Sequence, residues 1–513
     1  MKKMVKEKIK ILTARAIKNL YKKEVKVEVE RPRVKDYGDY TTSIAMEIKK
    51  NAREIAGQIK STILGKVEPK NGFINFFLSE EYLQKQVGEI LKKDGKFGKL
   101  NIGKNKKTNI EFISANPTGE LHIGNGRGAF FGDVLANVLE KVGYKVFREY
   151  YINDAKNSTQ IQELGRTALG EGKSYLTPYL KNVIQRLTPY SEKIKSESEA
   201  GYVLGQNVFG DIRSFIEKKL KIKFDLWVSE QNLYRQGRVK KVYNFLKSKN
   251  LVYKKDDAFW LDLSEFNQKD EVLIRRNGQS TYFLTDIAYH DYKIQRGFKK
   301  IINIWGADHQ GHVAKIKAAA KLLGYRGDLD ILISQVVRLK RGKISKRKGE
   351  IITLEELIDE VGLDVVRFLY LTKSLDTQME FDLELAKKQS EKNPVYYVQY
   401  AHARICSILR KIPNLRFKNS NLKLLIHPSE LNLIKQLIRL PEIIEETARD
   451  YQAQRLPQYS IELATVFHQF YRDCKVLAKD KALLRARLAL VLATKIVLKG
   501  TLDLMGISAP EKM

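Results

Sequence analysis

The spacing of hydrophobic residues changes along this chain and divides it into sections. Through residue 23 the apolar residues recur at threes and fours between charged ones, which predicts an amphipathic helix. The aromatic run NGFINFFLS (71–79) predicts a strand, and the stretch rich in Lys and Gly that follows at 92–109 is typical of a linker. We therefore expect a small α+β domain over residues 1–98.

The segment 99–378 has a pattern of strands that alternate with helices. A strand begins at Asn109 and leads through a polar loop into an amphipathic helix, and a second strand-like run follows at 145–152. This order implies a parallel sheet. Sheet-like runs return in STYFLTDIAYH, IINIWGADHQGH and LDILISQVVRL. Residues from about 157 to 275 are helical and charged and contain a hairpin pattern, LVYKKDDAFWLDL, so we interpret them as an insertion.

The last section, 379–513, has helical periodicity to its end, as in PVYYVQYAHARICSILRKI and ALLRARLALVLATKIVLKGTLDLMGI. The predicted fold class is α/β. We expect a Rossmann-like parallel-sheet domain with a connective insertion, a small α+β domain before it, and an all-α helical bundle after it.

The sequence lacks a membrane span, a signal peptide and a cysteine motif, and these absences bear on where the protein is found. No run of about 18 apolar residues suits a membrane span, and charges interrupt every apolar stretch of the N-terminus, unlike a signal peptide. Cys406 and Cys474 are the two cysteines, and no CxxC motif is present. We expect a cytoplasmic protein with two buried thiols, no membrane partner and no metal held by protein side chains.

The charge is strongly positive, with 93 Lys and Arg against 60 Asp and Glu and a formal net charge of +33. An excess of this size attracts polyanions and favours nucleic-acid binding. A general basic bias of the source proteome would produce the same excess, so charge alone does not decide the partner.

His122 stands before three alternating glycines in ANPTGELHIGNGRGAFF. The glycines fit a dinucleotide-binding fingerprint, but eight residues, NPTGELHI, separate the end of the strand, near Ala115, from Gly124, and that spacing is wrong for such a site. Glycine at 124 would let a nucleobase or phosphate approach the backbone. A helix that starts near Gly126 would direct its N–H groups there, and the imidazole can donate to phosphate oxygens.

About 220 residues further along comes RLKRGKISKRKGEIITLEELIDEVG. A loop of cations lies between Gly342 and Gly349, and a helix begins after Thr353 with Glu356 as its capping-box partner. Such a loop suits contact with a polyphosphate. A solvated run of charges in a basic protein is the equally simple alternative.

Together, HIGN at 122–125 and KISKR at 343–347 resemble the HIGH and KMSKS motifs of class I aminoacyl-tRNA synthetases. Longer segments resemble arginyl-tRNA synthetase in content and order. They are ANPTGELHIGNGRGAFFGDVLANVLEKVGYKVFREYYINDA, YFLTDIAYH, IWGADHQGH and NPVYYVQYAHARI. The closing LDLMGISAPEKM resembles the end of that family's anticodon-binding domain, the DALR type. The resemblance runs from about residue 30 to the last residue.

The resemblance implies a reaction in two steps. L-Arginine and ATP give arginyl adenylate and pyrophosphate, and the arginyl group then passes to the terminal adenosine of tRNA(Arg). The resemblance implies catalytic roles for His122, Lys343 and Lys346, and Mg²⁺ that accompanies ATP and is held by phosphates and water. Asn125 takes the place of the second histidine of HIGH. The residues implied to bind ATP are His122, Gly124, Asn125, Asp308, Lys343, Ser345 and Lys346.

A guanidinium substrate needs carboxylates and planar acceptors. The residues that the resemblance implies for arginine binding are Glu111, Ser114, Asn116, Tyr282, Asp286 and Gln310. Taken singly, Glu111 is equally typical of a surface carboxylate at a strand end, and Tyr282 of a core aromatic. The first domain is implied to contact tRNA. The last domain presents aromatic and basic residues for the anticodon arm, namely Tyr396, Tyr397, Tyr400, His402 and Arg404. We expect a monomer.

Two other functions remain open at this point. One is another enzyme on the same nucleotide-binding sheet, either a different class I synthetase or a small adenylyltransferase. The helical tail disfavours the small transferase, and Glu111 with Tyr282 and Asp286 disfavours an anionic amino acid. The other is a non-catalytic tRNA-binding paralogue, which we would expect to have lost His122 or the loop lysines.

Overall fold

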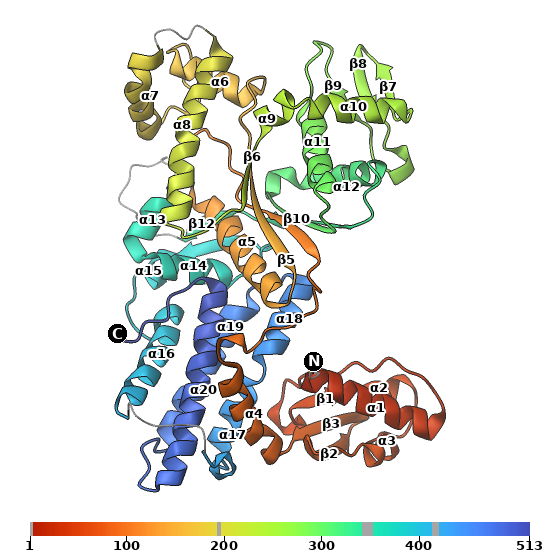
Figure 1. Cartoon of the computed structure of the whole chain (residues 1–513), viewed down its shortest axis with the longest axis vertical. Coiled ribbons are helices and arrows are strands. Elements are labelled where there is room, and N and C mark those ends of the chain that lie inside the picture. The colour runs from red at the N-terminus through yellow and green to blue at the C-terminus, as the bar shows by residue number, and fades with distance from the viewer. Residues whose placement is uncertain (1–3, 192–195, 341–351, 413–419) are drawn as a thin grey trace.

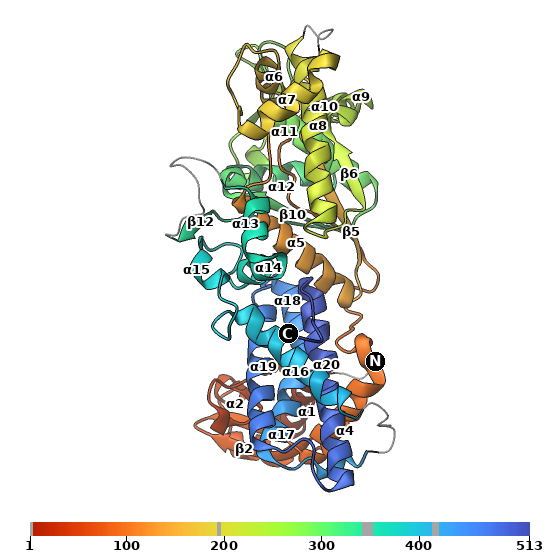
Figure 2. The same ribbon diagram turned by 90° about the vertical axis from the view of Figure 1, so that its left-hand side faces the viewer.

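The computed structural model describes residues 4–191, 196–340, 352–412 and 420–513. The molecule is elongated, with the insertion at one end and the N-terminal domain and C-terminal helices at the other (Figures 1 and 2). One continuous hydrophobic core runs from the N-terminal domain through the central helix α5 into the C-terminal helices, and a second, smaller core lies under the helices α10 to α12.

The N-terminal domain pairs a helix with a small antiparallel sheet. Helix α1 covers Val5–Tyr21, as its sequence predicts. The sheet has the order β1-β3-β2, with bounds Tyr40–Thr42, Phe73–Leu78 and Leu64–Lys70 in that order. The predicted aromatic strand is β3. Helix α4 (Glu80–Lys93) then leaves the domain and packs on the C-terminal helices α17 and α20 (Figure 1).

The centre of the molecule is a five-stranded sheet in the order β11-β10-β4-β5-β6, parallel throughout. In that order the strands are Asp328–Ser334, Lys300–Gly306, Lys107–Glu111, Lys145–Ile152 and Leu226–Ser229. The parallel prediction is confirmed, and Ile110 lies in register between Ile302 and Arg148. Strand β6 falls inside the predicted insertion, because a four-residue edge strand is too short to show a period.

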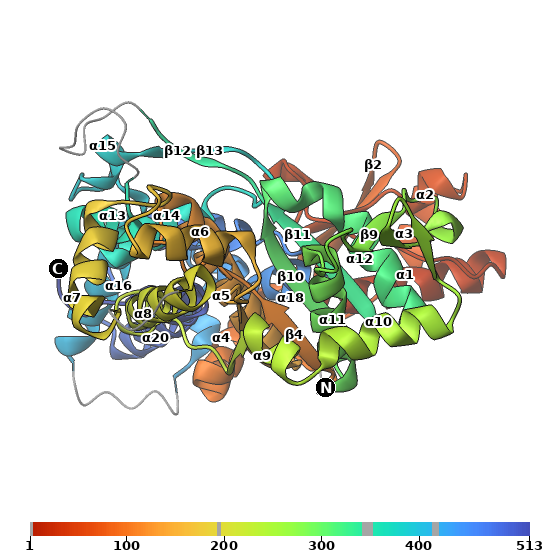
Figure 3. The same cartoon turned by 90° about the horizontal axis from the view of Figure 1, so that it is seen from above.

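The insertion forms two lobes that flank the sheet, as the view from above shows (Figure 3). One lobe holds the helices α6 (Thr159–Ala168), α7 (Pro178–Ser191) and α8 (Glu197–Lys218). The other holds α9 (Glu230–Arg235), α10 (Arg238–Ser248) and a three-stranded sheet of β7 (Val252–Lys255), β8 (Ala258–Leu261) and β9 (Glu271–Ile274). Strands β7 and β8 are the predicted hairpin.

Helix α5 (Ile123–Lys141) covers one face of the sheet and is buried on nearly every side. It packs on β4, β5 and β10, and from the other direction on α13, α14, α18 and α20. Gly132 lets the strand approach, since a Cβ there would lie 2.3 Å from Cγ of Phe112. The helix starts earlier than the predicted position near Gly126, because His122 acts as its N-cap.

The run STYFLTDIAYH is a helix, so the strand predicted there is wrong. Helix α11 (Tyr282–Gln295) begins after Thr281, whose hydroxyl accepts from the backbone N–H of Leu284. A short apolar run rich in β-branched and aromatic residues is ambiguous between strand and helix. The helix places Tyr282 and Asp286 one turn apart on the same face.

The C-terminal section is helical, as predicted. After α13 (Leu354–Val361) and α14 (Leu363–Leu371), strand β13 (Met379–Asp382) pairs with β12 (Val337–Lys340), and the short α15 (Leu383–Ala386) follows. The bundle consists of α16 (Pro394–Arg410), α17 (Pro428–Leu437), α18 (Leu440–Asp450), α19 (Arg455–Asp473) and α20 (Lys481–Met505). In the parts of the chain that the structure describes, no helix has the length and apolar character needed to cross a membrane.

A buried arginine connects the bundle to the sheet domain. Arg367 on α14 is 1% exposed, donates to the carbonyl of Met505 at 2.6 Å, and pairs with Asp133 of α5. It also donates to the carbonyl of Leu220 at the end of the first insertion lobe. One side chain therefore joins the last helix of the chain, the central helix and the insertion.

Candidate active site

His122 caps the N-terminus of α5. Its Nδ1 accepts from the backbone N–H of Gly124 at 3.0 Å, and the side chain of Asn125 accepts from the backbone N–H of His122 at 2.9 Å. Desolvation by the surrounding protein lowers the pKa of His122, so the ring is neutral. Since Nδ1 accepts, the proton lies on Nε2, and no described residue takes that donor. Gly124 lacks a Cβ that would lie 2.8 Å from the ring.

The chain after the lysine-rich segment lies directly against this helix start. The backbone N–H of Leu354 donates to the carbonyl of Leu121 at 2.7 Å, and that of Ile123 donates to the carbonyl of Ile352 at 3.3 Å. His122 and Thr353 thus form an antiparallel bridge, and α13 lies beside α5 (Figures 1 and 2). The predicted helix after Thr353, with its capping box, is confirmed.

The cations predicted to face the phosphates, Lys343 and Lys346, lie outside the described residues, as does Ser345. What the structure describes is the two ends of that segment. One end is Lys340, the last residue of β12, and the other is Ile352 beside His122.

Two residues after β4 adopt the left-handed backbone region. Ile113 has φ +69° and Ser114 has φ +40°, values that β-branched and other side chains rarely adopt. The bend turns Ser114 back, so that its hydroxyl donates to Glu111 at 3.0 Å and accepts from the backbone N–H of Tyr151 at 3.1 Å. Strain of this kind concentrates at functional sites.

Glu111 belongs to a buried polar network. Nζ of Lys293, which is fully buried, donates to Glu111 at 2.6 Å and to Oδ1 of Asn303 at 2.8 Å. The other side of that amide contacts Nε2 of His290 at 2.8 Å, and Nδ1 of His290 contacts the carbonyl of Asp286 at 2.7 Å.

The direction of each bond in this network follows from the lysine, which can only donate. The Asn303 amide must then donate to Nε2 of His290, whose Nδ1 donates to the carbonyl of Asp286. Burial, with Lys293 nearby, lowers the pKa of His290 to about 3 and keeps the ring neutral. The network therefore fixes both Glu111 and the helix turn that carries Asp286.

A second acidic residue, Glu230, lies close enough to Asp286 for their charges to interact, and it was not predicted from the sequence. Glu230 is 2% exposed, begins α9 after β6, and lines a small pocket with Ser158, Arg275 and Tyr282. Burial and the neighbouring Asp286 raise the pKa of Glu230 to about 8. Burial and Glu111 raise the pKa of Asp286 to about 7. A Glu that directly follows a sheet strand was the available signal, because parallel sheets bind ligands at the carboxyl ends of their strands.

Of the remaining predicted residues, Asn116, Asp308 and Gln310 come after strands of the parallel sheet, and Tyr282 begins α11. Asn116 is half-buried in the loop after β4, and Tyr282 is 41% exposed at the pocket. Asp308 and Gln310 lie on an exposed 3₁₀ turn (Ala307–His312) after β10, with Asp308 3.4 Å from His309. Within the described chain, no hydrogen bond or ion pair joins these last two residues to the acidic pocket.

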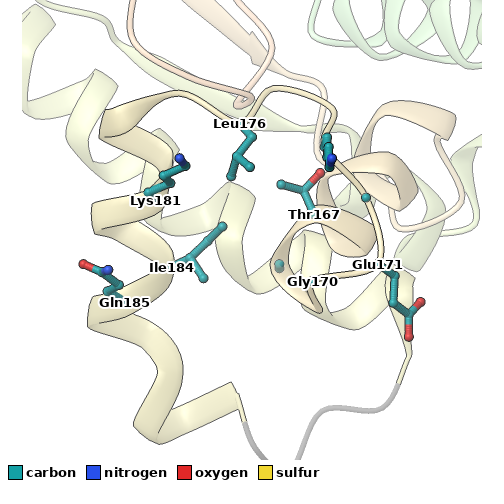
Figure 4. A pocket seen from close by; sticks show the side chains of 10 residues that line it. Thr167, Gly170, Glu171, Leu176, Lys181, Ile184 and Gln185 are labelled. Atoms are coloured by element: carbon teal, nitrogen blue, oxygen red, sulfur yellow. The ribbon is translucent and has the colours of Figure 1, made fainter.

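A larger cavity of about 670 Å³ lies inside the first insertion lobe (Figure 4). Its lining includes Thr167, Glu171, Leu176, Lys181 and Ile184. It shares no lining residue with the small pocket that contains Glu230. This larger cavity is therefore separate from the site described above.

On the helical bundle, an arginine lies against two exposed tyrosines. The Arg404 guanidinium lies 4.6 Å from the ring centre of Tyr400 and 5.1 Å from that of Tyr471 on α19, and it donates to the Tyr400 hydroxyl at 2.6 Å. Tyr400 and Tyr471 are 45% and 40% exposed. We call these three residues the Tyr400 cluster; Tyr471 was not predicted because it lies on another helix.

Two other residues predicted for this face pack inward. Tyr396 is partly buried against the hydrophobic core. His402 is 1% exposed, and its Nδ1 contacts the carbonyl of Pro510 at 2.9 Å. The prediction that His402 contacts unpaired bases is therefore wrong, because a helix position two residues from Tyr400 points away from its face.

The parallel sheet, with the glycine-rich helix start and its histidine, defines the catalytic domain of a class I aminoacyl-tRNA synthetase. Residues 86–164 and 182–389 match the family described as "tRNA synthetases class I (R), catalytic domain". Residues 1–78 match "Arginyl tRNA synthetase N terminal domain", and residues 398–513 match "DALR anticodon binding domain". The chain belongs to the arginyl-tRNA synthetase family.

Individual proteins agree with this assignment. The chain is 41% identical to the arginine–tRNA ligase of Carboxydothermus hydrogenoformans, over 96% of this chain and 95% of that one. It is 42% identical to that of Caldanaerobacter subterraneus, over 95% and 94%. The fold is similar to that of Thermus thermophilus arginyl-tRNA synthetase, with a TM-score of 0.80 at 22% identity over 99% of this chain and 100% of that one.

Proposed function

We propose that this chain is an arginine–tRNA ligase, which activates L-arginine with ATP and then transfers the arginyl group to the terminal adenosine of tRNA(Arg). One observation supports this most directly. His122 at the start of α5 and Glu230 at the start of α9 both follow strands of one parallel sheet, and Tyr282, one helical turn before Asp286, lines the same pocket as Glu230. The start of α5 could therefore contact the phosphates of ATP while the neighbouring pocket holds the positively charged side chain of arginine.

In the first step, a carboxylate oxygen of arginine attacks the α-phosphorus of ATP, and the bond to the β-phosphate oxygen breaks. Nε2–H of His122 donates to phosphate oxygens as their charge shifts, and the positive end of the α5 helix dipole favours negative charge at the same place. Lys343 and Lys346 neutralise the departing pyrophosphate. No covalent enzyme intermediate is needed, so catalysis consists of positioning and charge stabilisation.

The arginine side chain is held by its guanidinium. Asp286 and Glu230 supply carboxylate acceptors, and Tyr282 closes the mouth of the pocket. Glu111 does not contact the guanidinium directly, since Lys293 and Ser114 already donate to its oxygens. It supports the pocket by holding Lys293 and Ser114 in place. Asn116 and Gln310 contact the amino-acid backbone of the substrate.

ATP brings Mg²⁺. Among the described residues, no group of three His, Cys, Asp or Glu side chains is placed to hold a metal ion. We infer that phosphate oxygens and water hold most of the magnesium shell, as is usual for this ion. Asp308, on the turn after β10, is the residue that would accept from the ribose hydroxyls.

Pyrophosphate exchange into ATP, measured with each amino acid and with or without tRNA, tests this function. We expect exchange with L-arginine only, and only when tRNA is present, as is general in the family. Exchange with glutamate or cysteine would instead identify a different class I synthetase. Tight tRNA binding without exchange under any condition would identify a non-catalytic paralogue.

We propose that the Tyr400 cluster stacks on unpaired bases of the anticodon arm. Tyr400→Ala is expected to raise the KM for tRNA about 5- to 150-fold, equivalent to about 1–3 kcal/mol for one stacked base. The KM for arginine should not change. Tyr400→Phe keeps the ring and loses only the hydroxyl that Arg404 contacts, so it should stay close to the natural protein. Equal effects of the two substitutions would contradict stacking.

A further inference from the structure

One peptide group at the start of α5 connects the imidazole of His122 to a buried tyrosine. The N–H of Gly124 donates to Nδ1 of His122 at 3.0 Å. The carbonyl of the same peptide group, that of Ile123, accepts from the hydroxyl of Tyr370 on α14 at 2.7 Å. Because a peptide group is planar and rigid, these two hydrogen bonds depend on a single orientation of the backbone. A rotation of this group would break both.

Tyr370 lies too deep in the protein to contact a substrate itself. Its side chain is 2% exposed. The ring centre lies 5.6 Å from that of Phe130 on α5, in an edge-on arrangement, and 5.5 Å from that of Phe381 on β13. Packing on two sides fixes the place of the hydroxyl. Any effect of Tyr370 on the reaction therefore passes through the backbone of α5.

The helix that carries Tyr370 is itself held by the helical bundle. Asp364, near the start of α14, accepts from Gln399 of α16 at 2.9 Å and from the backbone N–H of Ser508 at 3.3 Å. Just after the end of α14, the hydroxyl of Ser374 lies 3.1 Å from Oε1 of Gln452, between α18 and α19. The tyrosine hydroxyl is therefore a donor with a rigid support, as a group that positions a catalytic side chain requires.

A second contact from the same region holds the next turn of α5. Arg127 is 2% exposed and donates to the carbonyl of Ser374. This contact would remain if the hydroxyl of Tyr370 were removed. Loss of the hydroxyl should therefore loosen the first turn, which carries His122, and leave the rest of α5 in place.

We propose that Tyr370 is a positioning residue for adenylate formation. Its hydroxyl holds the peptide group between Ile123 and Gly124, so that Nδ1 of His122 stays an acceptor and Nε2 keeps the hydrogen. A carbonyl that accepts a hydrogen bond also makes the N–H of its own peptide group a stronger donor, which strengthens the bond to the imidazole. The inference rests on the proposed function, since it takes His122 as the donor to the phosphates of ATP.

Tyr370→Phe removes the hydroxyl and keeps the ring. We expect kcat for arginine-dependent pyrophosphate exchange, with tRNA present, to fall about 10- to 100-fold, since misplacement of a reacting group by about 1 Å can cost about 100-fold. The KM for arginine and for tRNA should change by less than about twofold, because neither contact is altered. An unchanged kcat would overturn the proposal.

Tyr459→Phe is the matched control. Tyr459 on α19 is 1% exposed, and its hydroxyl donates to the carbonyl of Gln436 on α17 at 3.0 Å. The substitution therefore removes the same kind of buried hydrogen bond, but within the bundle. It should leave kcat at the value of the natural protein. An equal fall of kcat in both variants would mean that loss of any such bond slows the enzyme, and the proposal would be wrong.

A double variant shows whether Tyr370 acts through His122. If it does, adding Tyr370→Phe to His122→Ala should slow pyrophosphate exchange by no more than about a further twofold, because the group that the hydroxyl positions is already absent. If the two losses multiplied instead, Tyr370 would act on the reaction by another route, and the assignment would be overturned.

Hydrogen–deuterium exchange of the backbone tests the contact without reference to activity. In Tyr370→Phe the amides of residues 122–126 should exchange up to about tenfold faster, as expected for loss of one buried hydrogen bond, while the later turns of α5 keep their protection. Unchanged protection of residues 122–126 would show that the hydroxyl does not hold this turn. If the protection falls as expected but the natural protein shows no pyrophosphate exchange with arginine, the proposed function is wrong, and the role of Tyr370 in adenylate formation falls with it.

Discussion

His122→Ala is expected to slow the formation of arginyl adenylate by about 100- to 1,000-fold, the usual cost of losing one donor to a developing charge. The reason is the tautomer set by the helix cap. Nδ1 accepts from Gly124, so Nε2 carries the hydrogen and is the donor that we propose for the phosphate oxygens. Arginine-dependent pyrophosphate exchange in the presence of tRNA measures the rate, and the Kd for tRNA should stay within about twofold because His122 lies on the sheet domain.

His122→Asn separates this role from that of the cap. Asparagine is one of the best N-cap residues, so it retains an acceptor for the Gly124 N–H but lacks a donor at the position of Nε2. We expect the same loss of exchange as in His122→Ala. The alanine variant alone should lose about 1 kcal/mol of stability in urea unfolding. Recovery of the rate in His122→Asn would mean that His122 serves only as the cap.

The elements with local signals could be predicted from the sequence. The second sheet strand, 145–152, has the predicted bounds, because its β-branched and aromatic residues directly follow the turn at Gly143. The helix after Thr353 has a capping box that a single sequence displays in full. The start of α5 was placed three residues late, because histidine is not a usual N-cap and its ring replaces the expected Ser, Thr, Asp or Asn.

The pairing of charges across elements could not be predicted in this way. Glu111 and Lys293 are 182 positions apart and meet at 2.6 Å only because α11 is a helix. Reading that segment as a strand would have placed Lys293 elsewhere. Glu230 was missed for a similar reason, since its meaning depends on β6, a strand of four residues, joining the edge of the sheet beside β5. Acidic residues that come together from separate helices and strands produce no periodic pattern in the sequence, so periodicity cannot predict them.

Asp286→Asn is expected to lower kcat/KM for arginine by about 30- to several thousand-fold, since removal of one partner from a buried charge pair costs about 2–5 kcal/mol. The carboxylate of Asp286 has no other partner in the described chain, so the interaction that the substitution removes is the one with the guanidinium of the substrate. The matched control is Asp291→Asn on the same helix. Asp291 faces Arg238 and Lys241 and accepts from Gln295, so its substitution should leave kcat/KM nearly unchanged.

Citrulline shows whether Asp286 reads the charge of the substrate or only supports the pocket. Its ureido group is nearly isosteric with guanidinium but neutral, so an anionic pocket should discriminate strongly against it. In Asp286→Asn the preference for arginine over citrulline, measured as the ratio of kcat/KM in exchange, should fall by most of the loss seen with arginine. If both substrates lost activity by the same factor, Asp286 would act through the shape of the pocket. A fall with arginine alone would identify direct charge recognition, because that coupling vanishes when either partner is neutral.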